Sequence, residues 1–362
     1  MKTFSRFLIG TSPLSGVAVL LLTSSNAHAE DLKVIRTMIS ITCARFGNYW
    51  PNPKAKEPSY NTWSWLPRTN FYLKGDMAPG SEVSIEYLSS DGKPWLTVPL
   101  PANRIGESNY YAFGNDYSTQ EAGKPAKILV GTFPFKIRLK NALEGTNKVL
   151  YYGKYKVSKF HKGNALPAFK NQFEYVVDQD WRMNMAYLSP DLNSSSADAP
   201  MLQIRVYMKG QVKQERLEGV LYHEGKIIGT KELRGGTTNN PFSLTTSGMD
   251  TNDPIWQQWT FAWGAIRMHP SEQGGVAEQW YLTEHPGAYE LKVLRNGQLA
   301  RSVKFNVDAS GKILDKGFGA AANAEGTFIV PSKVLGTTDG KWNPLAWKTD
   351  AFYANPLTGF VG

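Results

Sequence analysis

The chain has 362 residues, a formal net charge of +9 and a single cysteine, Cys43. One cysteine excludes an intramolecular disulfide, so each domain must be held by its hydrophobic core alone. The length exceeds what one compact β-sandwich usually holds and therefore indicates two domains.

The first 29 residues have the pattern of a cleaved secretory signal. Lys2 and Arg6 precede an apolar stretch, and small alanines stand at positions −3 and −1 of a cut after Ala29. Gly, Ser and Pro interrupt the apolar stretch, which falls short of the roughly 20 residues that a membrane-spanning helix needs. We therefore expect an exported protein, periplasmic or extracellular, that begins at Glu30 and has no membrane span.

Alternating apolar and polar residues predict β-strands along the first half of the chain. Cys43 is in phase with Ile39 and Ile41, which indicates a buried thiol. Further strands are expected at 83–87, 93–100, 135–140 and 149–160, with turns at Asp91-Gly92 and Glu144-Gly145.

The second half continues the same pattern. Strand groups are expected at 201–210 and 217–233. In 285–307, strict alternation on both sides of Asn296-Gly297 predicts a β-hairpin with a type I′ turn. No segment offers a long amphipathic helical stripe.

One segment, residues 253–268, fits two structures. Asp253 as N-cap, Pro254, and tryptophans at 256, 259 and 263 favour a helix. The alternation of Trp259, Phe261 and Trp263 favours a strand, and we prefer a short turn at 253–258 followed by a strand because a sandwich needs one there.

Two stretches, 133–157 and 287–307, each place a charged alternating strand, a Gly turn and a second alternating strand at the end of a domain. This arrangement resembles the last two strands of immunoglobulin-like domains of bacterial envelope proteins. The resemblance is architectural and transfers no functional residue. It implies an all-β fold: two tandem immunoglobulin-like antiparallel β-sandwiches with an irregular aromatic C-terminal tail.

The expected domain boundaries follow from where the alternation lapses. The signal covers 1–29, the first sandwich 30–165 and the second 166–310, with the joint inside 161–172 and a long polar loop at 189–200. The tail, 311–362, is too aromatic for a disordered segment, so we expect it to dock on a domain. Its large rings are Trp342, Trp347, Phe352, Tyr353 and Phe360.

Candidate metal or acid–base groups are few. His269, Glu272, Glu284 and His285 bracket one short loop and could bind zinc or pair an acid with a base, but both histidines precede prolines, which also mark strand ends. Asp250, Asn252 and Asp253 offer calcium-type oxygens without the remaining ligands of a known loop, and turn capping explains them as well. We assign no metal, no cofactor and no catalytic residue.

Aromatic residues gather in the segment 47–73. Trp50, Trp63 and Trp65 lie in a Pro-interrupted polar stretch, and exposed rings there could stack on sugar faces. The alternative is that they plug the open end of a sandwich as core residues.

Basic residues gather in the segment 136–162, which holds eight Lys or Arg and one acidic residue, Glu144. Because the first three alternate with apolar residues, they share one outward face, and two lysines of the following strand share theirs. The predicted basic face comprises Lys136, Arg138, Lys140, Lys154 and Lys156. The alternative is a solubilising or edge-protecting face, which would usually mix signs.

These patterns predict an exported, non-catalytic binding or scaffold protein of the bacterial envelope that contacts an anionic polymer or glycan. Nucleic acid is not the expected partner, and the sequence does not fix the oligomeric state. The alternative is a carbohydrate-active or metal-dependent hydrolase with its site between the two domains, because paired carboxylates from distant strands leave no local spacing.

Overall fold

A computed structural model of the chain describes residues 32–46, 64–115, 126–161, 173–191, 200–210, 216–234, 242–243, 256–270, 279–324, 326–349 and 359–362. The expected signal, 1–29, and the expected joint after residue 161 lie outside these ranges. The described chain is all-β, as predicted, with several antiparallel sheets and four short helical turns. The turns are η2 (Arg36–Met38), η5 (Asp180–Arg182), α1 (Phe318–Ala321) and α2 (Ala346–Thr349).

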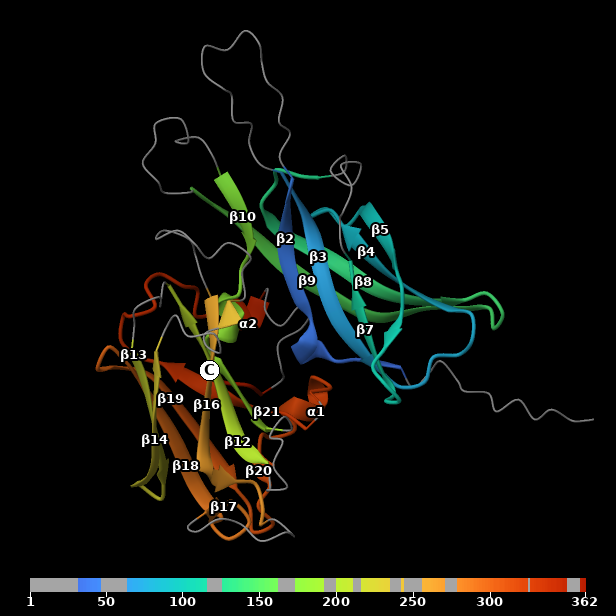
Figure 1. Cartoon of the computed structure of the whole chain (residues 1–362). Helices are drawn as coiled ribbons and strands as arrows, with labels where there is room; N and C mark the ends of the chain where they lie inside the picture. Colours follow the sequence, from blue (N-terminus) through green and yellow to red (C-terminus); the bar gives the residue numbers. More distant parts are fainter. Residues whose placement is uncertain are drawn as a thin grey trace, which may run out of the picture.

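Two five-stranded sheets form one half of the molecule, at the top of Figure 1. In the first sheet, β3 (Ser64–Lys74) pairs with β1 (Lys33–Val34), β2 (Ser40–Phe46) and β7 (Tyr110–Gly114), and β7 pairs with β6 (Asn103–Arg104). The second sheet has the order β10 (Phe173–Val177), β9 (Thr146–His161), β8 (Gly131–Asn141), β4 (Ser81–Leu88) and β5 (Pro94–Leu100).

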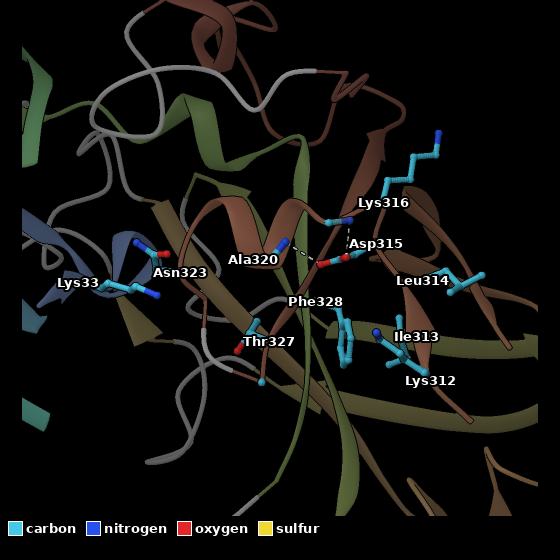
Figure 2. A pocket seen from close by; sticks show the side chains of 13 residues that line it. Lys33, Lys312, Ile313, Leu314, Asp315, Lys316, Ala320, Asn323, Thr327 and Phe328 are labelled. Atoms are coloured by element: carbon cyan, nitrogen blue, oxygen red, sulfur yellow. Dashed lines mark hydrogen bonds between the residues drawn. The ribbon is translucent and has the colours of Figure 1, made fainter. Parts of the chain in front are cut away.

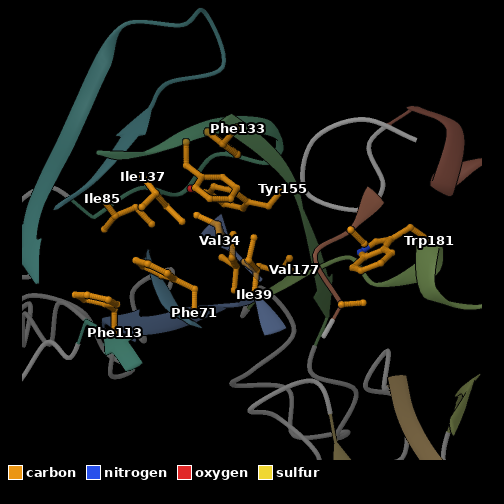
Figure 3. Packing of buried hydrophobic residues seen from close by; sticks show 14 of the residues in the cluster. Val34, Ile39, Phe71, Ile85, Phe113, Phe133, Ile137, Tyr155, Val177 and Trp181 are labelled. Atoms are coloured by element: carbon orange, nitrogen blue, oxygen red, sulfur yellow. The ribbon is translucent and has the colours of Figure 1, made fainter. Parts of the chain in front are cut away.

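Period-two alternation gives each of these sheets one apolar face, and the two faces pack together. Phe71 and Phe113 of the first sheet stack with ring centroids 5.2 Å apart and face Ile85 and Ile137 of the second (Figure 3). The hydroxyl of Tyr87 crosses the interface and donates to Oγ1 of Thr69 at 2.7 Å, so the buried phenol is satisfied.

The other half of the molecule is one eleven-stranded sheet. Its main path is β14 (Lys226–Arg234), β13 (Arg216–His223), β18 (Gly287–Arg295), β19 (Gln298–Val307), β21 (Phe328–Val334), β11 (Met185–Pro190), β12 (Met201–Lys209), β16 (Trp256–Arg267) and β15 (Phe242–Ser243). β17 (Trp280–Tyr281) runs parallel to β16, and β20 (Ile313–Leu314) pairs with β19.

This large sheet folds over so that strands from its two ends enclose a second core. The strands β14 and β16 are in contact although six strands separate them along the sheet. The neighbouring strand β13 also lies close to β16, and this requires glycine at position 219 of β13, because a Cβ there would collide with the ring of Phe261 from β16. Leu291 and Val303 of the hairpin are fully buried against this cluster.

The sequence prediction for the hairpin is confirmed. β18 and β19 are antiparallel partners, and Asn296 and Gly297 have φ values of 51° and 78°, the positive pair that a type I′ turn requires. The ambiguous segment is a strand from Trp256 to Arg267, with Trp259, Phe261 and Trp263 buried, so the preferred strand is confirmed but the expected turn is wrong for residues 256–258. Its expected helix start at Asp253 lies outside the described residues.

The expectation of an irregular C-terminal tail is wrong for residues 328–334. These residues form β21, which lies in the middle of the large sheet between β11 and β19. Among the other described residues of the tail, Trp347 and Phe360 are buried in the core cluster that contains Phe71 and Phe113, whereas Phe352 and Tyr353 lie outside the described residues. The first pair of sheets also extends past the boundary expected at residue 165, because β10 pairs with β9.

Charged side chains are buried where the two halves meet. The guanidinium of Arg301, fully buried, donates to both carboxylate oxygens of Asp339 at 2.6 and 2.8 Å. The Lys209 ammonium donates to the buried Asp180 carboxylate at 2.8 Å, and the Arg295 guanidinium reaches Asp339 at 3.4 Å. We call these five residues the junction ion cluster; each charge has an opposite partner, as burial requires.

Candidate anion-binding surfaces

The structure brings the five predicted cations onto one surface. β8 and β9 pair as expected, and Lys136, Arg138 and Lys140 point away from the core while Ile137 and Leu139 are fully buried. Lys154 and Lys156 lie opposite Pro134 and Thr132 in the register, on the same outward side. We call Lys136, Arg138, Lys140, Lys154 and Lys156 the basic face.

The neighbouring strand β4 adds carboxylates that a count over residues 136–162 leaves out. Glu86 lies opposite Lys136 and Glu82 lies opposite Lys140. The Glu86 carboxylate accepts from Nε of Arg138 at 2.8 Å and is 3.8 Å from Nζ of Lys136. The surface is therefore not purely basic: two of its five cations share one carboxylate.

The remaining cations differ in their surroundings. Among the described residues, neither Lys140 nor Lys154 has an ion-pair partner. The main-chain carbonyl of Lys156 accepts a hydrogen bond from the N–H of Asp178. The pKa of the Asp178 carboxyl is raised, first by burial and then by repulsion from Asp180. The Tyr152 ring is 44 % exposed and lies opposite Lys136, so the surface also carries an open aromatic ring.

The aromatic prediction is wrong for Trp65. Its ring is 1 % exposed, packs edge-on against Phe133 at 5.1 Å and against Trp95 at 5.3 Å, and its Nε1 donates to the Leu129 carbonyl. A ring enclosed on its faces cannot stack on a sugar, so Trp65 is a core residue. Trp50 and Trp63 lie outside the described residues.

The histidines are arranged differently from the predicted loop cluster. His285 stacks on Trp280 with ring centroids 3.7 Å apart, and its histidine neighbour is His223, at 6.1 Å. Nδ1 of His285 lies 2.9 Å from the Tyr281 carbonyl oxygen, whereas His269 is exposed beside the carbonyl of Pro270. Among the described residues no His, Cys, Asp or Glu group is suited to hold a metal.

Three further candidates lie outside the described part of the chain or in its core. Glu272 and the calcium-type group Asp250, Asn252 and Asp253 are outside it. Cys43 is buried as predicted, and burial raises the pKa of its thiol far above the usual value.

The sequence analysis missed a cleft of about 720 Å³ where the two halves meet (Figure 2). Lys33 of β1 lines one side, and residues 312–328 around β20 and α1 line the rest. All of its described lining residues except Lys33 lie within 312–328, far along the chain from Lys33, and each alone has an ordinary polar or apolar pattern. The local clue is the triplet of lysine, acid and lysine at 312–316, which we read as the start of an irregular tail. Glu325 lies outside the described residues.

No family model matches this chain, and no curated protein matches it either. In the described part of the chain, no helix is both long and apolar enough to cross a membrane.

Proposed function

We propose that this protein is an exported, non-catalytic binding or scaffold protein of the bacterial envelope that holds an anionic polymer or glycan on its basic face. We further propose that its two halves are immunoglobulin-like sandwiches in tandem. The observation that carries the function is the alignment of five cations on the outward side of two paired strands, with Lys140 and Lys154 unpaired among the described residues.

The chemistry of the surface favours a flexible polyanion over a single fixed anion. Four of the five cations are lysines, which act as mobile point charges, and only Arg138 has the planar fork that reads one group bidentately. The Arg138 fork is already engaged by Glu86. Attraction to such a surface is diffuse and falls as salt screens the charges over a Debye length of about 8 Å at physiological ionic strength.

The geometry favours binding over the alternative hydrolase. The hydrolase alternative places its site in the cleft between the halves. Among the described residues that line this cleft there is one carboxylate, Asp315. Both oxygens of Asp315 accept main-chain N–H groups: Oδ1 from Gly317, Oδ2 from Gly319 and, at 3.3 Å, from Ile329. This carboxylate caps a turn, which accounts for its hydrogen bonds.

The test compares two variants that lose the same charge. In the first, the five residues of the basic face are changed to Gln. In the second, five exposed lysines of the other half, Lys226, Lys231, Lys304, Lys333 and Lys341, are changed to Gln. Retention on purified envelope is measured at low and at moderate salt.

We expect the first variant to lose retention and the second to keep it. A lysine beside an anionic surface is worth about 1 kcal/mol, so the loss of the two unpaired lysines alone should weaken binding about 30-fold. Equal retention of parent and first variant, with the fold intact by circular dichroism, would reduce the basic face to a solvated sheet surface.

Export has a separate test. Intact-mass measurement of protein recovered from the periplasm or the medium should show a chain that begins at Glu30. A chain that retains residues 1–29 contradicts the proposed location.

A further inference from the structure

The cleft between the halves has walls that are fixed before any ligand arrives. The main-chain N–H of Arg36 donates to the Ala322 carbonyl at 3.1 Å, and Nδ2 of Asn323 donates to the Val34 carbonyl at 3.1 Å. These bonds tie β1 and η2 to the turn that follows α1. The cleft is therefore held by hydrogen bonds between the two halves.

The opposite wall is equally constrained. A Cβ at position 319 would collide with the Thr327 carbonyl, so only glycine lets α1 approach the start of β21 this closely. Lys316 has a φ of 54° and Gly317 a φ of 80°, and the Asp315 carboxylate holds this left-handed turn through its main-chain bonds. Phe318 anchors α1 below, buried against Phe360.

Positive charge dominates the described lining. Lys33, Lys312 and Lys316 line the cleft against the single carboxylate of Asp315. None of the three lysines forms an ion pair with a carboxylate in the described ranges. The pKa of the exposed Asp308 is lowered first by hydrogen bonds from the Ser310 side chain and the Lys312 main-chain N–H, and the charge of Lys312 is the last of the causes. In Figure 2, Lys33 and Lys312 lie on opposite sides of Phe328 and Thr327, whereas Lys316 points away.

Around these two lysines the cleft offers both apolar and hydrogen-bonding surface. The Phe328 ring and the exposed Leu314 side chain are apolar, and the Thr327 hydroxyl and the Asn323 carbonyl oxygen can bond to hydroxyl groups. A volume of about 720 Å³ lies in the range of small-ligand sites. A sugar ring that carries an anionic group matches this combination, because it presents an apolar face, hydroxyls and a charge together.

We propose that this cleft binds a single acidic sugar unit between Lys33 and Lys312, whose positive charges attract its anionic group. This inference rests on the proposed function and names its ligand class. The basic face attracts the polymer, and the cleft binds one unit of it. An acidic peptide would also meet the two lysines but has no use for the hydroxyl-binding groups between them.

The test uses the full exported chain and isothermal titration calorimetry. The probes are a trimer of galacturonic acid, glucose 6-phosphate, the neutral galactose trimer and a hexapeptide of glutamate. The variant is Lys33→Gln with Lys312→Gln, and the matched control is Lys226→Gln with Lys231→Gln, two exposed lysines away from the cleft. All four positions are exposed, so melting temperatures near that of the parent confirm that the variants fold.

We expect at least one of the two acidic sugars to bind the parent and the control, while the neutral trimer and the peptide bind at least tenfold more weakly. Loss of a hydrogen bond to a charged group should weaken the cleft variant at least about tenfold for the acidic sugar. The two anionic arms distinguish a carboxylate from a phosphate as the group that is read.

Three results would overturn the proposal: neither acidic sugar binds the parent, the cleft variant binds like the parent, or the glutamate peptide binds more tightly than the sugars. These failures are distinct from failure of the proposed function. The basic-face variant should still bind the acidic sugar while losing retention on envelope, and the cleft variant should keep most retention while losing the sugar.

Discussion

Removal of the Asp339 carboxylate is the sharpest test of the buried ion pairs in the half formed by the large sheet. In Asp339→Ala, the guanidinium of Arg301, fully buried, loses bonds of 2.6 and 2.8 Å, and Arg295, 2 % exposed, loses its carboxylate at 3.4 Å. The main-chain N–H of Lys209 also loses its acceptor at 2.8 Å. Breaking a buried ion pair from one side costs about 3–5 kcal/mol because the remaining charge stays buried without compensation.

The expected loss is a large part of the 5–15 kcal/mol by which most domains are stable. With a guanidinium chloride slope of about 4 kcal/mol per M, the midpoint of unfolding should fall by roughly 1 M, measured by tryptophan fluorescence. Asp339→Asn keeps one acceptor oxygen, so its midpoint of unfolding should lie between those of the parent and Asp339→Ala. Asp91→Asn, which removes an exposed partner of Lys93, is the control and should leave the midpoint unchanged. A midpoint for Asp339→Ala within 0.2 M of the parent, about the error of such measurements, would refute the reasoning.

Three further predictions concern single residues. Burial raises the pKa of the Asp178 carboxyl above 3.8, so the stabilising contribution of this group is complete below that pH and is lost as the pH rises through the raised value. The free energy of unfolding of Asp178→Asn should therefore increase relative to that of the parent between pH 4 and 7. A difference that stays constant over this range would contradict the prediction. Cys43 should react with a thiol reagent only after unfolding, because burial keeps the thiol protonated, and rapid labelling of the native protein would show that the strand opens. Asn296→Ala should lower the free energy of unfolding by about 1 kcal/mol in chemical denaturation, because alanine tolerates the φ of 51° poorly, whereas Asn296→Gly should leave it nearly unchanged. If both variants lose the same free energy, the hydrogen bond from the Arg216 N–H to Oδ1 of Asn296 is the larger effect.

Local pattern predicted the strands and their faces well. The turn at Asn296-Gly297 and the burial of Tyr289, Leu291 and Val303 follow from alternation and turn chemistry, which are properties of a few adjacent residues. The outward orientation of Lys136 and Arg138 follows from the same rule.

What the sequence could not show is which distant segments meet. Glu86 neutralises part of the basic face because β4 pairs with β8, a partnership that no local pattern encodes. Trp65 reads as an exposed ring in its own segment and is a core residue because Phe133 and Trp95 cover it. The cleft is invisible in sequence for the same reason, since Lys33 and Lys312 belong to different halves.

The place of β21 fixes the order in which the chain can finish folding. Residues 328–331 of β21 pair with β11, and residues 332–334 pair with β19. Until the last tenth of the chain is available, both of these strands are open edges that can pair with another molecule. A polypeptide in which residues 328–334 have not yet been synthesised therefore cannot close its second core, and one cut short before Phe328 should aggregate. Pairing of β21 with both strands is therefore the step that closes the second core.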